Sequence, residues 1–147
     1  MRTVDGQVIE KQFPLVNSDK LNAKRTARFV YDWNVDGGVA GSIPFRGDAL
    51  PLKSIIIGGR AYVIRALTGA GGTTAGIVAV AADDLVADAV VAGAPWNVPA
   101  TEIAIIPVGA LASDIVWTAG GIPALVVTTH NLTDGAVDLF LDYIVTD

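Results

Sequence analysis

Apolar and polar residues alternate with a period of two along much of this chain, which is the pattern of β-strands that bury one face. The clearest run covers residues 27–35, in which Phe29, Tyr31 and Trp33 fall on the same side. Aromatic residues at alternate positions are typical of strands. The run therefore predicts a strand that carries Tyr31 and Trp33 into the core.

Further strand-like runs follow at fairly regular spacing, separated by turns rich in glycine, proline and asparagine. They cover residues 39–44, 54–57, 60–67, 73–80, 102–107, 115–118, 124–129 and 136–145. Gly58 and Gly59 between two of them predict a bulge or a sharp corner. The helices that an α/β fold would need between its strands are missing. About eight strands predict an all-β fold, an antiparallel β-sandwich or jelly roll.

One short helix is expected, over residues 83–88. Asp83 is a suitable N-cap, Asp84 suits the positive end of the helix, and alanines surround both.

The first 26 residues lack this periodicity. They predict an extended N-terminal arm (1–26) before a β-sandwich domain (27–147). The arm carries five basic residues and three acids. It also carries apolar side chains, and it contains no periodic strand or helix that would bury them within the protein's own domain. These apolar residues are Phe13, Leu15, Val16 and Leu21.

Composition narrows the function classes. The chain has 147 residues, of which 52% are hydrophobic and 17% charged, so it is a folded domain with an apolar surplus for a partner to cover. With no cysteine, disulfides, thiolate nucleophiles and zinc ribbons are excluded. The longest uncharged run, residues 115–133, is broken by glycines and Pro123 and predicts two strands, not a membrane span. The N-terminus has no apolar signal-peptide core, so we expect a reducing or redox-indifferent compartment.

Charge is divided along the chain. All ten basic residues lie in the first 65 positions together with six acids, whereas the remaining 82 positions hold nine acids. Either the molecule keeps this polarity, or folding mixes the two halves and cancels the field. At a pI of about 4.6, nucleic-acid binding is not expected.

No residue pattern predicts an enzyme. Asp138 and Asp142 alternate with apolar residues, as on a solvated strand face, and do not suggest a glycosidase pair. The acids at 83, 84 and 88 lack the twelve-residue calcium loop. The single histidine, His130, lies in a predicted turn. The sequence has no Gly-x-Ser-x-Gly nucleophile elbow, so a catalytic triad that uses this histidine is not indicated. Trp96, between two prolines, either docks on a sugar or partner or anchors its own loop. We expect no cofactor and no metal.

Several of these segments together resemble the capsid decoration, or cement, proteins of tailed bacteriophages. They are residues 27–38 (ARFVYDWNVDGG), 41–44 (GSIP), 50–51 (LP), 55–59 (IIIGG) and 139–145 (LFLDYIV). The likeness covers roughly residues 27–145 and rests on turns and strand chemistry. The resemblance implies a jelly-roll body that assembles as a homotrimer. It also implies that the protein is made in the host cytoplasm and binds the major capsid protein on the outside of the phage head.

We expect the N-terminal arm to attach the protein to the capsid shell. The alternative is that the arm pairs as an edge strand within its own trimer. The expected capsid-contact residues are Arg2, Lys11, Phe13, Leu15, Lys20, Lys24 and Arg25. The second candidate function is a carbohydrate-binding module of a phage tail or fibre, since jelly rolls are also lectin folds. An enzyme ranks third.

Overall fold

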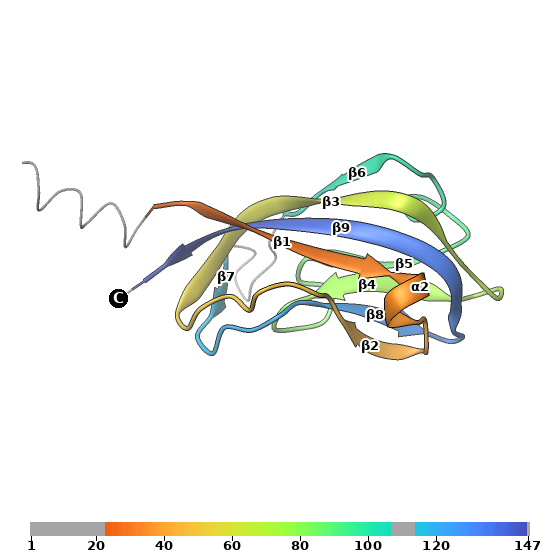
Figure 1. The fold of residues 1–147 in the computed structure, drawn as a ribbon, viewed down its shortest axis with the longest axis horizontal. Coiled ribbons are helices and arrows are strands. Elements are labelled where there is room, and N and C mark those ends of the chain that lie inside the picture. Colours follow the sequence, from red (N-terminus) through yellow and green to blue (C-terminus); the bar gives the residue numbers. More distant parts are fainter. Residues whose placement is uncertain (1–22, 107–113, 147) are drawn as a thin grey trace, which may run out of the picture.

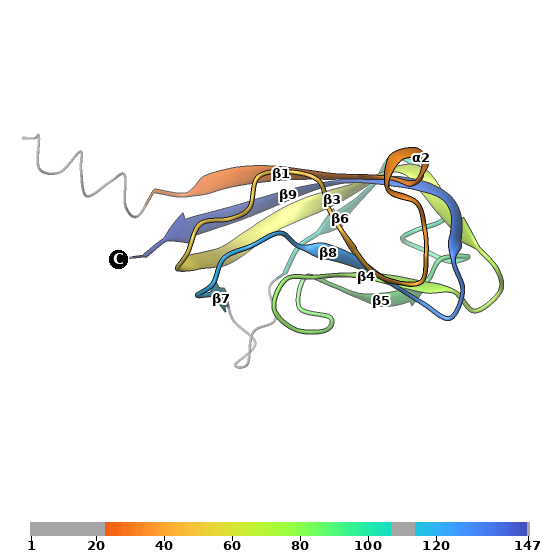
Figure 2. The same ribbon diagram turned by 60° about the horizontal axis from the view of Figure 1, so that its bottom comes forward.

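Two antiparallel sheets lie face to face in the computed structural model, which describes residues 23–106 and 114–146 (Figure 1, Figure 2). The first sheet has the spatial order β1 (Arg25–Asp32), β9 (Leu132–Val145), β3 (Ser54–Gly69), β6 (Thr101–Ala104), and β7 (Ile115–Trp117) pairs with the start of β3. The second has the order β2 (Gly41–Pro44), β8 (Ala124–Thr128), β4 (Thr74–Val78), β5 (Val86–Val90). Every pairing is antiparallel.

The connections between the strands make this sandwich a jelly roll. With the short β7 set aside, the chain crosses from one sheet to the other after every strand except β4, which is followed by its neighbour β5. Such crossing in two four-stranded sheets is the jelly-roll topology. The predicted all-β sandwich is therefore confirmed, with nine strands among the described residues.

The predicted bulge lies inside one long strand. Residues 54–57 and 60–67, expected as separate runs, both belong to β3, and its register with β9 shifts between Ile56 and Gly58. Gly59 has a φ of +142°, and a Cβ there would lie 2.1 Å from the carbonyl oxygen of Phe140. Only glycine allows the two backbones to approach this closely.

The core lies between the inner faces of the two sheets. Phe29 and Tyr31 of β1 and Leu139 and Leu141 of β9 are fully buried, as is Trp96 from the loop before β6. The prediction that Tyr31 belongs to the core is confirmed.

The prediction for Trp33 is wrong in its details, because the strand ends at Asp32. There the Asp32 carboxylate accepts a hydrogen bond from the backbone N–H of Asn34 and caps the short helix α2 (Trp33–Asp36). Trp33 is half-buried at the core margin and donates its indole N–H to the carbonyl oxygen of Leu132. Val35, which would fall on the same side as Trp33 in a strand that continued to residue 35, is 66% exposed.

The helix predicted over residues 83–88 is absent, and strand β5 begins there at Val86. The buried carboxylate of Asp84 accepts hydrogen bonds from the backbone N–H groups of residues 79, 80 and 81. It closes the turn between β4 and β5, and Val86 then faces the core. Asp84, which was expected at the N-terminal end of a helix, instead accepts hydrogen bonds from the backbone of a loop.

The predicted arm lies mostly outside the described residues. Its last two residues, Arg25 and Thr26, form the start of β1 and pair with Tyr143 and Asp142 of β9. The division of the chain at residue 26 stays a prediction.

The burial of Trp96 gives a stability prediction. Trp96→Ala should lower the free energy of unfolding by about 3–5 kcal/mol, because it empties a large, fully buried site and removes the hydrogen bond from the indole N–H to the carbonyl oxygen of Ala75. Urea denaturation measures the loss. Trp33→Ala is the matched control, and its effect should be smaller because Trp33 is only half-buried; equal losses would contradict the assignment.

Candidate interaction surface

The outer face of the first sheet gathers arginine and aromatic side chains from four strands. We call this group the arginine–aromatic cluster; it comprises Arg28, Arg60, Tyr62, Glu102, Asp138 and Phe140. The strand register brings them together, because Arg28 pairs with Phe140, which in turn pairs with Arg60. The next outward row places Asp138 beside Tyr62, which pairs with Glu102.

Phe140 lies at the centre of the cluster. The Tyr62 ring meets it edge-on, with centroids 5.9 Å apart and an interplanar angle of 81°. The guanidinium of Arg28 lies 5.9 Å from its ring centroid on the other side, within the range of a cation–π contact. Both neighbours come from different strands, so the ring ties β1, β9 and β3 together on the outer face.

Ion pairs surround the aromatic pair. Arg28 lies 2.6 Å from the Asp138 carboxylate, and Glu102 accepts the Tyr62 hydroxyl at 3.0 Å while lying 3.5 Å from Arg60. The Tyr62 hydroxyl and the Glu102 carboxylate raise the pKa of Arg60. Arg60 and Glu102 are both more than half exposed, and such pairs stabilise a fold little. Their chemistry is available to a partner.

The bulge hollows this surface. A depression of about 250 Å³ is lined by Thr26, Gly59, Arg60, Tyr62, Phe140 and Asp142. A second, of about 300 Å³, lies on the β6 side of Arg60. Both are at the small end of small-molecule sites and are open to solvent. They suit protruding side chains of a macromolecular partner, for which arginine and tyrosine are frequent anchors.

Among residues 23–106 and 114–146, the same strand order brings bases of the first half of the sequence next to acids of the second half. Because β9 lies between β1 and β3, its acids face the bases of both: Arg28 pairs with Asp138, and Arg65 with Asp134 at 2.8 Å. Of the two alternatives, these described ion pairs favour the one in which folding mixes the halves.

A second polar group lies where β1 meets α2, and it serves the fold. Arg65 bridges Asp32 and Asp134 at 3.0 and 2.8 Å, and Arg46 pairs with Asp36 at 2.8 Å. The Asn34 N–H and then Arg65 lower the pKa of Asp32, and Arg65 lowers that of Asp134.

Tyr31 lies beside this group. Its hydroxyl donates to the carbonyl oxygen of Gly37 at 2.6 Å, and burial raises its pKa far above the ordinary value.

The predicted contact residues are only partly visible. Lys24 and Arg25 are exposed just before and at the start of β1. Five others lie outside the described residues: Arg2, Lys11, Phe13, Leu15 and Lys20.

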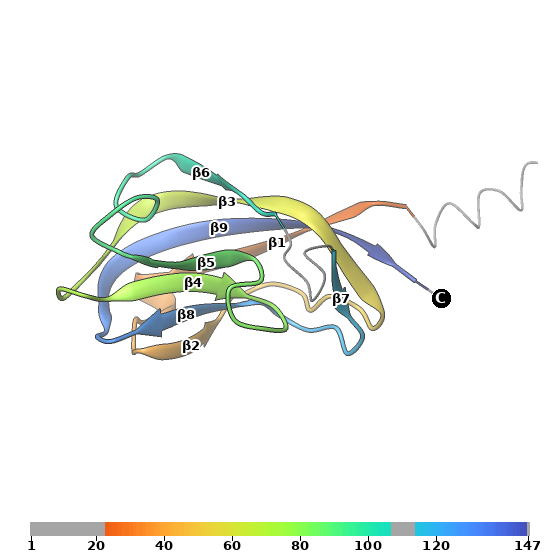
Figure 3. The ribbon, with the colours of Figure 1, turned by 180° about the vertical axis from the view of Figure 1, so that it is seen from behind.

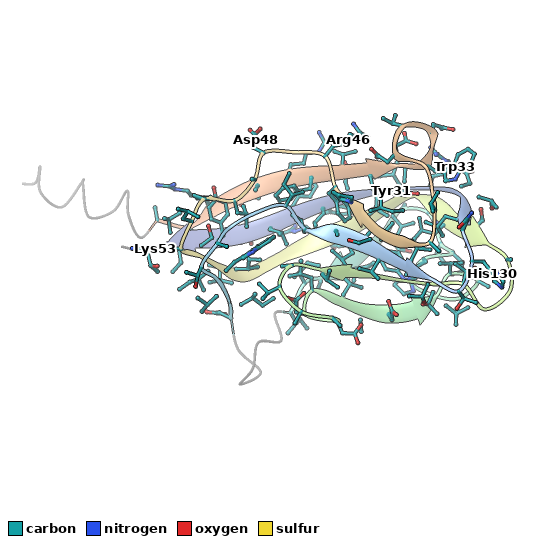
Figure 4. All side chains as sticks on the ribbon, turned by 90° about the horizontal axis from the view of Figure 1, so that it is seen from below. Tyr31, Trp33, Arg46, Asp48, Lys53 and His130 are labelled. Atoms are coloured by element: carbon teal, nitrogen blue, oxygen red, sulfur yellow. The ribbon has the colours of Figure 1, made fainter. Side chains whose placement is uncertain are left out.

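His130 and Trp96, the two single residues weighed as site candidates from the sequence, lie outside the arginine–aromatic cluster. His130 lies in the exposed loop between β8 and β9, towards the same end of the sandwich as Trp33 and far from Lys53 (Figure 4). Trp96 is buried and anchors its own loop, so its indole does not offer a surface to a sugar or a partner.

Within residues 23–106 and 114–146, no group of three or more histidines and acids has the geometry to hold a metal ion. In the same ranges, no helix is long and apolar enough to cross a bilayer.

Comparisons with known proteins find this fold in phage capsids. A chain in the cyanophage Pam1 capsid asymmetric unit matches with a TM-score of 0.57 at 12% identity, over 99% of this chain and 97% of that chain. A chain in the acidic stable capsid structure of Helicobacter pylori bacteriophage KHP30 matches with a TM-score of 0.54 at 12% identity, over 84% and 89%. No protein-family model and no curated protein matches the sequence. At this identity, the matches show a shared fold.

The Arg65 bridge gives a pH prediction. Carboxylates whose pKa is lowered by folding stabilise the native state above their ordinary value of 3.8, and this contribution is lost as the pH falls through their folded pKa. Arg65→Met should therefore be less stable than the wild type at pH 7, and the gap should narrow below about pH 4.

Urea midpoints at pH 7, 5 and 3 measure this gap. Lys24→Met, which removes an exposed charge outside the bridge, should show no such change with pH. A gap for Arg65→Met that stays constant down to pH 3 contradicts the role of the two carboxylates.

Proposed function

We propose that this chain is a structural protein of a phage virion, a decoration or cement protein that binds the outside of the head and stabilises it. The observation that carries the proposal is the jelly roll, which matches a chain of the Pam1 capsid over nearly the full length of both. The matched chain is therefore close in extent to this one.

Surface chemistry supports a binding role. The arginine–aromatic cluster has the composition of an interface centre, and its exposed Arg60–Glu102 pair contributes little to the fold. The decoration role in particular rests on the resemblance of residues 27–145 to cement proteins. The carbohydrate-binding alternative is not favoured, since Trp96, its best candidate platform, is buried.

In this proposal the first sheet faces the shell. The N-terminal arm leads into β1, and β1 also carries Arg28 of the cluster, so arm and cluster belong to the same sheet. The partner is the major capsid protein, the location is the capsid surface after synthesis in the host cytoplasm, and the assembled form is a homotrimer.

Removal of the arm tests the attachment. A variant that starts at residue 23 keeps all of β1, so it should fold normally and lose binding to heads that lack this protein. Co-sedimentation with purified heads measures binding, and circular dichroism confirms the fold.

A full-length variant distinguishes the contribution of the apolar side chains of the arm from the effect of shortening the arm. Changing Phe13, Leu15, Val16 and Leu21 to serine keeps every arm charge, and we expect it to lose most of the binding because burial of apolar surface supplies most of the affinity. If both variants co-sediment with heads as well as the wild type does, the arm does not attach this protein to the head.

A further inference from the structure

Strand β6 forms an edge of the first sheet and pairs there with β3 (Figure 3). The N–H of Ile105, just after β6, donates to the carbonyl oxygen of Gly59 at 3.0 Å. Because the backbone groups of an antiparallel strand point alternately to its two sides, Glu102 and Ala104 direct theirs away from β3. Among residues 23–106 and 114–146, these outward amides and carbonyls have no hydrogen-bond partner. The edge of β6 therefore offers two residues to which another strand can bind.

The edges of β1 and β2 are closed to such a strand. On β1, Val30 exchanges two backbone hydrogen bonds with Arg46, each of 2.9 Å. The chain then passes close to the next outward carbonyl of β1, since a Cβ on Gly47 would lie 2.7 Å from the carbonyl oxygen of Arg28. On β2, Pro44 has no backbone N–H to donate.

The edges of β5 and β7 also have occupied groups. On β5, the N–H of Asp88 donates to the carboxylate of Asp83 at 2.9 Å, and the carbonyl oxygen of Val90 accepts the N–H of Gly93 at 3.0 Å. The last carbonyl of the three-residue β7 accepts the N–H of Gly120. Folded proteins block strand edges because an open edge pairs with other chains. In the part of the chain that the structure describes, β6 is the edge without such a block, which indicates that it has a partner.

A hollow lies next to this edge on the outer face of the sheet. It measures about 300 Å³ and is lined by Gly59, Arg60, Glu102 and Ala104. Arg60 and Glu102 lie 3.5 Å apart, and both side chains are more than half exposed. A strand added to β6 would place one outward side chain beside Glu102 and another, two residues along, beside Ala104. The second of these side chains would enter the hollow and reach Arg60.

Charge defines the chemistry of the added segment. Opposite charges on directly paired residues stabilise a sheet, so a lysine or arginine belongs opposite Glu102. An acidic side chain belongs opposite Ala104, because a guanidinium binds a carboxylate well. A second copy of β6 fits poorly, since the two Glu102 carboxylates would become direct or diagonal neighbours between chains of net charge −5.

We infer that an extended segment of the major capsid protein, with a basic and an acidic residue two positions apart, adds to the edge of β6 as a further strand. The inference rests on the proposed function, in which the first sheet faces the shell, and adds the backbone contact through which the shell is held. In such strand addition, main-chain hydrogen bonds give affinity and side-chain pockets give specificity.

A proline on the edge of β6 tests the inference. The N–H of Ala104 points away from β3, and proline is tolerated at such edge positions, so Ala104→Pro should fold normally. It should bind heads that lack this protein at least about tenfold more weakly in co-sedimentation, because it removes a donor and its ring obstructs the added strand. Val90→Pro is the matched control; it removes an outward N–H on the edge of β5, where the residue is 46% exposed, and should bind heads as the wild type does. Circular dichroism verifies folding, and light scattering gives the mass of each variant.

Amide hydrogen exchange in the wild type tests the same contact without a substitution. Exchange at Glu102 and Ala104 should slow when the protein binds heads, because amides in strand pairing are protected, whereas exchange at Val90 should not change.

The charge of the partner has its own variant. Glu102→Gln removes the charge and keeps an acceptor for the Tyr62 hydroxyl. It should lower the affinity for heads by about two- to fivefold. Unchanged affinity contradicts the basic residue opposite Glu102.

The outcomes separate this inference from the proposed function. Wild-type head binding by folded Ala104→Pro overturns the inference and leaves the cement function intact, as does unchanged amide exchange in β6 on head binding. If Ala104→Pro has a lower mass than the wild type, the edge pairs with a second copy and the inference is wrong. A wild type that does not bind heads overturns the proposed function and the inference with it. If Ala104→Pro does not fold, the exchange measurement decides.

Discussion

The pairing of β9 with both β1 and β3 is the interaction on which the rest of this structure depends. The last strand in the sequence lies between the first strand and the longest one, so the first sheet is complete only when residues 132–145 are in place. This pairing buries Leu139 and Leu141 against Phe29 and Tyr31 in the common core. It also brings acids from the end of the chain to bases from its beginning, which is why a sequence with strongly divided charge folds into a molecule with local ion pairs.

The bulge at Gly58 and Gly59 sets what this sheet presents to the outside. A register shift in β3 determines which side chains face outward after it, because strand side chains alternate between the two faces. Beyond the bulge, Arg60 and Tyr62 point away from the core, while Ala61 and Val63 are buried. The glycines leave space where side chains would stand, and the hollow beside Phe140 follows. One backbone irregularity thus shapes both the core packing and the outer face of the first sheet.

Much of the fold could be predicted from sequence, because strand alternation and glycine turns are local signals. The alternation of residues 27–32 correctly placed Phe29 and Tyr31, and the paired glycines correctly marked the bulge. Two errors arose where one acid had more than one use. Asp32 ended its strand by capping α2, and Asp84 bound loop amides where a helix was expected.

The arginine–aromatic cluster was not predicted, since its members alternate on separate strands and meet only through strand pairing. Asp138 was correctly assigned to an outward face, but nothing local shows that Arg28 lies opposite. The two sheets share one core and yet differ outside, and core packing does not require that difference. Outward positions are free to vary as far as folding is concerned, so the arginine–aromatic cluster on the outer face of the first sheet is a feature that core packing does not explain.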